Sequence, residues 1–141
     1  MAMMLDSIDL GEQYDLGGDQ LEWVDEFEWD AVAQEQDRSL AGNLIVQEGL
    51  KVYGRPITLS SNGAAWFVLS LVRQLEILRD QPGRVMPLTL PDGREFHVIF
   101  NRANGAALEA KPLWRQVNPG PDALYELTLR LITVAPPPPV P

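Results

Sequence analysis

The stretch VMPLTLPDGREFHVIF, residues 85–100, decides the class of fold that this chain can adopt. A Pro-Asp-Gly turn separates two runs in which apolar and polar residues alternate, and this pattern predicts a β-hairpin with one buried face. The second run divides into two faces, with Phe96, Val98 and Phe100 on one and His97 and Ile99 on the other. We therefore expect a fold built on antiparallel β-structure.

Other segments of the chain carry the same alternation. The clearest is ALYELTLRLITV, which places Tyr125, Leu127, Leu129 and Leu131 toward a core. Weaker or shorter strands are predicted for RSLAGNLIVQEG, RPITL and ALEAKPLW, which are residues 38–49, 55–59 and 107–114. Pro56 suits a strand beginning or an edge position, because proline cannot donate to a ladder.

The segment LEWVDEFEW, residues 21–29, sets acidic side chains among large aromatic ones. Alternation of this kind is typical of a half-buried strand, with the acids in water and the aromatic residues packed. Asp25 interrupts the apolar face, and a bulge near it would restore the register. The predicted apolar face comprises Leu21, Trp23, Phe27 and Trp29.

One helix is predicted, over about residues 63–80. Ser61 or Asn62 can cap its start, and Pro82 and Gly83 end it. Its broad apolar face, formed by Phe67, Leu71, Leu75 and Leu78 with Val68, Leu69 and Val72, should lie against a sheet. The predicted fold class is α+β, mainly antiparallel β.

Composition bounds the function of this 141-residue chain. Residues 1–37 hold twelve acids and no Lys or Arg, a formal charge of −12, whereas residues 38–141 hold eight acids and eleven bases, a formal charge of +3, giving the net −9. An acidic surface repels phosphate backbones, so nucleic-acid binding is not expected, and contacts with a basic surface are. Cysteine is absent, which removes disulfides and thiol chemistry.

These patterns divide the chain into three parts. Residues 1–20 are predicted to form a flexible acidic arm, residues 21–134 a single β-rich domain, and residues 135–141 a proline-rich tail that favours an extended helix. The apolar runs are too short to cross a bilayer, and the N-terminus lacks the basic region of a secretory signal. A soluble protein without membrane insertion is therefore expected.

No residue emerges as a catalytic, cofactor-binding or metal-binding candidate. The N-terminal acids do not match the spacing of a calcium loop, and His97 has no orienting partner or nucleophile in its pattern. Ser60 and Ser61 lack a nucleophile elbow, so helix capping explains them better. For Trp23, Trp29, Trp66 and Trp114, packing in a core is favoured over a carbohydrate-binding platform.

The order of LEWVDEFEW, YGRPITL, one helix, LTLPDGREFHVIF and LYELTLRLITV resembles small tail or baseplate proteins of tailed bacteriophages. The likeness covers about residues 21–134, and GRPITL followed by a helix and an L-x-D-G-R hairpin is its most specific part. The resemblance implies a β-sandwich or split barrel with a flanking helix. The acidic arm and the proline tail have no counterpart in it.

The resemblance also implies a role. It predicts a virion structural protein, made in the cytoplasm of the bacterial host, that forms a homo-oligomeric ring and contacts other phage tail proteins without enzymatic activity or a cofactor. The alternative is a monomeric adaptor that binds a partner through its acidic arm. An enzyme is the third hypothesis, and the missing acid, base and nucleophile argue against it.

Overall fold

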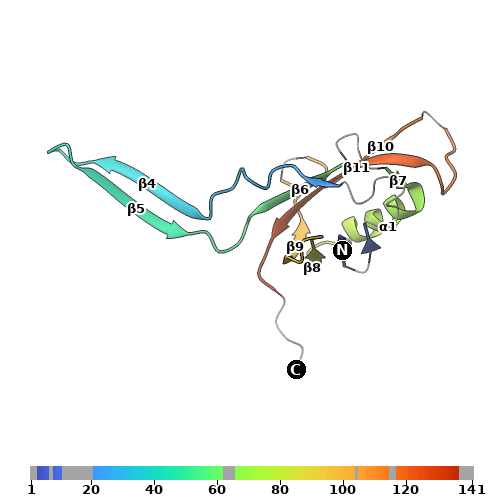
Figure 1. Ribbon diagram of the computed structural model, residues 1–141, viewed down its shortest axis with the longest axis horizontal. Helices are drawn as coiled ribbons and strands as arrows, with labels where there is room; N and C mark the ends of the chain where they lie inside the picture. The colour runs from blue at the N-terminus through green and yellow to red at the C-terminus, as the bar shows by residue number, and fades with distance from the viewer. Residues whose placement is uncertain are drawn as a thin grey trace, which may run out of the picture.

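The computed structural model describes residues 3–6, 8–10, 21–61, 66–103, 105–114 and 117–136. Figure 1 shows a body that packs one helix against a sheet, and a two-stranded arm that projects far from that body. Within the described ranges the fold is α+β and mostly antiparallel, which confirms the predicted class.

The elements of the body follow the chain in a simple order. In the described residues the body holds the strands β1 (Met4–Leu5), β2 (Ile8–Asp9), β3 (Glu22–Trp23), β6 (Pro56–Ser60), β7 (Phe67–Val68), β8 (Met86–Thr89), β9 (Glu95–Phe100), β10 (Leu108–Pro112) and β11 (Leu124–Thr133), and the helix α1 (Leu69–Arg79). The two-stranded hairpin of β4 (Val32–Arg38) and β5 (Leu44–Leu50) is called the arm from here on, and is distinct from the acidic segment predicted at residues 1–20.

The hairpin predicted from residues 85–100 is confirmed as β8 and β9. Met86 lies opposite Val98 and Leu88 opposite Phe96, so the predicted inward residues share one face. Gly93 takes a φ of 96° in the turn, a backbone conformation that glycine adopts without steric cost. This hairpin positions one half of the sheet.

The long strand β11 holds the sheet together. It pairs with β9 and β10 along one edge and with β6 and β7 along the other. Leu127, Leu129 and Leu131 are buried, as the alternation predicted, and the residues between them are half-buried on the opposite face. The described strands follow the order β2-β1-β8-β9-β11-β6-β3.

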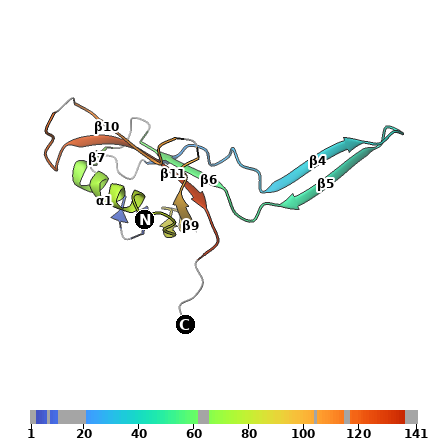
Figure 2. The same ribbon diagram turned by 180° about the vertical axis from the view of Figure 1, so that it is seen from behind.

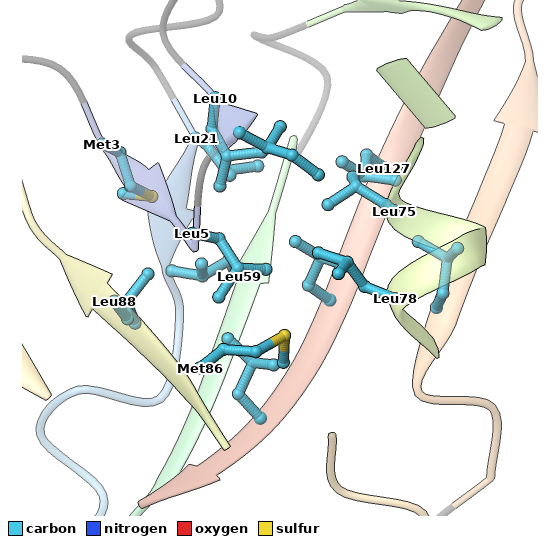
Figure 3. Packing of buried hydrophobic residues seen from close by; sticks show 14 of the residues in the cluster. Met3, Leu5, Leu10, Leu21, Leu59, Leu75, Leu78, Met86, Leu88 and Leu127 are labelled. Carbon is cyan, nitrogen blue, oxygen red and sulfur yellow. The ribbon is translucent and has the colours of Figure 1, made fainter. Parts of the chain in front are cut away.

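The helix α1 covers one face of this sheet. Its buried residues are Leu69, Leu71, Val72, Leu75 and Leu78, and Figure 3 shows side chains from α1, the sheet and the N-terminal strands gathered in one cluster. The helix begins later than predicted, because the backbone of Phe67 and Val68 pairs with β11 instead. Ser61 does not cap it, since the Ser61 hydroxyl accepts a hydrogen bond from Leu127 N at 2.8 Å.

The predicted flexible arm at residues 1–20 is wrong for residues 3–6 and 8–10. These residues form β1 and β2, and β1 pairs with β8. Leu5 and Leu10 are fully buried, so the apolar residues between the acids supply the reason for folding. Residues 11–20 of the predicted arm lie outside the described residues.

Two strand predictions also need correction. In residues 21–29 only Glu22 and Trp23 form a strand; a turn follows, and Phe27 is 93% exposed rather than packed. The strand predicted for residues 38–49 is the second half of a hairpin, because Gly42 turns the chain with a φ of 88°.

Beyond β11, Ala135 and Pro136 are exposed, and residues 137–141 of the predicted tail lie outside the described residues.

Candidate functional site

The arm is the feature of this molecule that its own fold does not explain. β4 and β5 pair with each other over seven residue pairs and form a sheet of their own. Figures 1 and 2 show from both sides that this sheet extends away from the body. At its tip, Ser39 N donates to Asn43 O at 2.9 Å and Asn43 N to the Ser39 hydroxyl at 3.1 Å, which fixes the turn.

The register of the hairpin gives the arm two different faces, because side chains opposite each other share a face. The apolar-amide face comprises Val32, Gln34, Gln36, Arg38, Leu44, Val46, Glu48 and Leu50. The acidic face comprises Ala33, Glu35, Asp37, Ile45, Gln47 and Gly49. The first face therefore carries four aliphatic side chains, and the second carries two acids and no base.

Hydrogen bonds order the middle of the apolar-amide face. The Gln34 amide donates to Glu48 Oε1 at 2.7 Å, and the Gln36 amide donates to Gln34 Oε1 at 2.5 Å. These bonds are solvent-exposed, so each adds little to stability. They hold three long side chains in one row beside the aliphatic pair Val32–Leu50.

Aliphatic side chains on the arm lie in solvent. Leu50 is 77% exposed, and Leu44, Ile45 and Val46 are each about half exposed. Single exposed aliphatic residues are common, but a row of them along an isolated hairpin marks an interaction surface. The arm therefore has the chemistry of a segment that another surface covers.

A stack of aromatic and cationic side chains forms the root of the arm. The guanidinium carbon of Arg55 lies 4.5 Å from the Trp23 ring centre and 5.5 Å from that of Trp29. Arg94 lies 5.4 Å from the Trp23 ring and Lys51 lies 5.6 Å from the Trp29 ring. Each such contact contributes about 0.5–1 kcal/mol at an exposed site. The five side chains connect the chain before β4 to the chain after β5.

Polar contacts fix the same root to the body. Arg55 donates to Glu26 O at 2.8 Å, and Arg94 forms an ion pair with the Glu26 carboxylate at 3.0 Å. The Asp25 carboxylate accepts from Thr58 N at 2.9 Å and from the Thr58 hydroxyl at 2.8 Å. Asp25 thus closes a turn onto β6, where the sequence predicted a bulge.

The four tryptophans do not form one platform. Trp23 and Trp29 contact Arg55, whose N–H donates to Thr133 at the end of β11. Trp66 precedes β7 and Trp114 follows β10, and both of those strands pair with the first residues of β11. Ten strand residues span roughly 30 Å, so the two pairs lie at opposite ends of the sheet.

His97 lies on β9, half-buried, at a cavity of about 280 Å³ beside the root. The other residues lining this cavity include Trp29, Tyr53, Glu95 and Thr133. Among the described residues, no side chain forms a hydrogen bond or ion pair with the His97 ring that would orient it as a base. Ser60 lies in β6 and Ser61 bonds Leu127, so neither serine is presented as a nucleophile.

Near the root, the pKa values of the pair Asp92 and Arg94 are shifted. The Arg94 backbone N–H and guanidinium hold the pKa of the Asp92 carboxyl below its ordinary value of 3.8, and the hydrogen bond to Glu26 raises the pKa of Arg94. Within the described ranges no three His, Asp or Glu side chains gather where they could bind a metal ion. The helix in that part of the chain is also too short and polar to span a membrane.

Comparison with known proteins identifies no relative: no family model, no curated protein and no solved structure matches this chain. Sequence reasoning missed the arm, although the residues that form it were visible. The signal was the turn sequence Ala-Gly-Asn at residues 41–43, flanked on both sides by residues that can form strands.

Proposed function

We propose that this protein is a structural subunit of a bacteriophage tail or baseplate, which assembles into a homo-oligomeric ring and contacts adjacent tail proteins. The observation that carries the proposal is the arm, which projects from the body and presents Leu44, Val46 and Leu50 to solvent. An arm of this kind acts by covering, or being covered by, another protein. The resemblance to small tail and baseplate proteins supplies the setting.

The sheet of the body also fits the split barrel that the resemblance implies. Two strands pair with each edge of β11, β9 and β10 along one and β6 and β7 along the other. β11 is therefore longer than each strand that it pairs with. Such a fork lets a twisted sheet divide into two halves that curve apart. We propose that the body is a split barrel with α1 on its flank.

Sedimentation velocity tests the assembly. The intact protein should sediment as an oligomer, and a variant with Leu44→Ser and Val46→Ser should shift toward the monomer while keeping the circular dichroism of the folded body. The control is Ile77→Ser, because Ile77 is an aliphatic residue at least as exposed as Leu44 and Val46 but lies on α1. An intact protein that stays monomeric at all concentrations would favour the adaptor and overturn the ring.

Immunoelectron microscopy tests the location. Antibody raised against the purified chain should label the tail or its distal end on intact phage particles. Label confined to infected cells and absent from particles would contradict a virion role.

A further inference from the structure

A free strand edge lies on the body at β10. β10 pairs with β11 along one edge, and no other strand of the described residues pairs with β10. Ala107 O accepts a hydrogen bond from Arg130 N at 2.8 Å. Because hydrogen-bonding residues alternate along an antiparallel pair, Leu108 and Ala110 direct their backbone N–H and C=O groups away from β11.

Pro112 ends this edge. It occupies the next outward position of β10, where a proline costs no ladder hydrogen bond because its missing N–H would point to the open side. The edge is therefore open at Leu108 and Ala110 and closed at Pro112. A strand added to this edge would form backbone hydrogen bonds at these two residues and would end before Pro112.

The arm has matching open edges. Lys51 N donates to Ala31 O at 2.8 Å, so the odd-numbered residues of β4 and β5 bond each other and the even-numbered ones point outward. The outward residues of β5 are Leu44, Val46, Glu48 and Leu50, of which three are aliphatic. On β4 Val32 alone is aliphatic among the outward residues. β5 is thus the edge suited to a partner with an apolar face.

The side chains of both edges fall on compatible faces. The outward residues of β10 share the face of buried Leu127 and Leu129, which lie opposite Ala110 and Leu108. The outward residues of β5 share the apolar-amide face of the arm. In an antiparallel pair, opposite residues point to the same side, so pairing β5 with β10 continues the apolar face of the body with the apolar face of the arm.

The polar sides of the two strands then coincide as well. Lys111 lies on the other face of β10, opposite Glu126. The same pairing sets the uncharged Gln47 of β5 on that side, and the acids Glu35 and Asp37 lie one strand farther away on β4. A slip of one residue would turn the outward aliphatic residues of β5 to the polar side of β10. The match of the two apolar faces therefore selects the register.

The arm and β10 lie at opposite ends of the molecule. Figures 1 and 2 agree that the arm leaves one end of the long axis and that β10 lies toward the other. An arm cannot reach the β10 of its own chain in this arrangement. Contact between two different surfaces of identical copies is head-to-tail, which generates rings if it closes and filaments if it does not.

We propose that β5 of one copy adds as an antiparallel strand to the free edge of β10 on the next copy, head to tail. This inference rests on the proposed function, for which it supplies the contact that builds the ring. The occupant of the β10 edge is a second copy because the chain itself carries an open strand, β5, whose apolar face continues that of β10. The arm gains a covered edge, and the body gains a further strand.

Cysteine cross-linking tests the contact directly, because the chain contains no cysteine. Gln47→Cys lies on the acidic face of β5 and Glu109→Cys on the same side of β10. A chain with both changes, treated with a short bis-maleimide, should give a ladder of covalent species beyond the dimer on a denaturing gel. Gln47→Cys with Gln74→Cys, on the exposed side of α1, is the matched control and should give no ladder.

The outcomes separate this inference from the proposed function. An oligomeric parent whose double variant forms no covalent species overturns the β5–β10 contact and leaves the ring in place. A ladder that stops at the dimer overturns the head-to-tail arrangement. Cross-linking of Gln47→Cys alone shows arm-to-arm pairing and also overturns it, whereas a parent that is monomeric at every concentration overturns both proposals.

Discussion

Strands of the body and of the arm contain similar aliphatic residues, but these residues are buried in the body and exposed in the arm. Leu129 in β11 is fully buried beneath α1, while Leu44 in β5 is half exposed on a strand of similar pattern. The difference is a second layer: the body sheet has a helix packed on it, and the arm has none. A lone two-stranded hairpin is marginally stable in water. The arm is therefore held by the side chains of its root and lacks the second layer that stabilises the body.

The largest contrast comes from placing a charge in each region. Leu75→Asp should prevent folding, because Leu75 is fully buried and an unpaired charge there costs a large share of a stability of about 5–15 kcal/mol. Val46→Asp, its matched control on the arm, should leave the body folded. Circular dichroism with thermal melting measures both. A cooperative, native-like melt for Leu75→Asp would show that α1 does not cover the core.

Truncating one leucine in each region should give a smaller difference between body and arm in the loss of stability. Leu129→Ala should reduce the free energy of unfolding by about 2–5 kcal/mol, since it leaves a cavity in the core. Leu44→Ala should change it by no more than about 0.5 kcal/mol, as expected for an exposed site. Urea denaturation of the monomeric protein provides the values. Equal losses at both sites would mean that the arm folds against the body.

The root joins the two regions, and its two tryptophans should differ. Trp23 packs edge-to-face on Phe96 at 5.9 Å and against the core, so Trp23→Ala should lower the stability of the body by about 2–4 kcal/mol. Trp29→Ala removes contacts to Arg55 and Lys51 and should chiefly speed amide exchange in β4 and β5. Hydrogen exchange by mass spectrometry distinguishes these results. Unchanged amide exchange of β4 and β5 in Trp29→Ala would show that the stack does not stabilise the arm.

The smallest expected effect is a pH dependence. The pKa of Asp92 is depressed by hydrogen bonds from Arg94, so ionised Asp92 stabilises the fold above its unfolded pKa. That contribution is lost as the pH falls below about 4 and through the depressed folded value. Asp92→Asn should slightly flatten the acid limb of stability. Acid titrations followed by fluorescence test this, and identical acid limbs for Asp92→Asn and the parent would contradict it.

Much of the body was predictable from the sequence. Hairpin β8–β9, strand β6 and the alternation of β11 appear where the pattern placed them, because their periodicity and turn residues agree with the tertiary fold. Two local patterns were misleading. The apolar residues near the N-terminus alternate with acids over too few positions to show a strand, and Phe67 belongs to a strand although it continues the helical apolar face.

The arm and its root could be predicted less well. The alternation of LEWVDEFEW predicts one long strand, but Asp25 bonds Thr58 and the strand ends after Trp23. The partner that stops it lies more than thirty residues away in the chain, so no local window contains the signal. The stack on Arg55 was missed for the same reason, because Arg55 lies far in sequence from Trp23 and Trp29.

By itself, the sequence determined which segments can be strands, where the chain turns at Pro-Asp-Gly, and that α1 has an apolar face to bury. These properties depend on neighbouring residues, whose side-chain direction follows from the backbone period. Only the tertiary structure decided that one face of β6, β8, β9 and β11 would be covered while β4 and β5 would not. Burial depends on which distant element packs on a strand, and that is a property of the assembled chain rather than of any window within it.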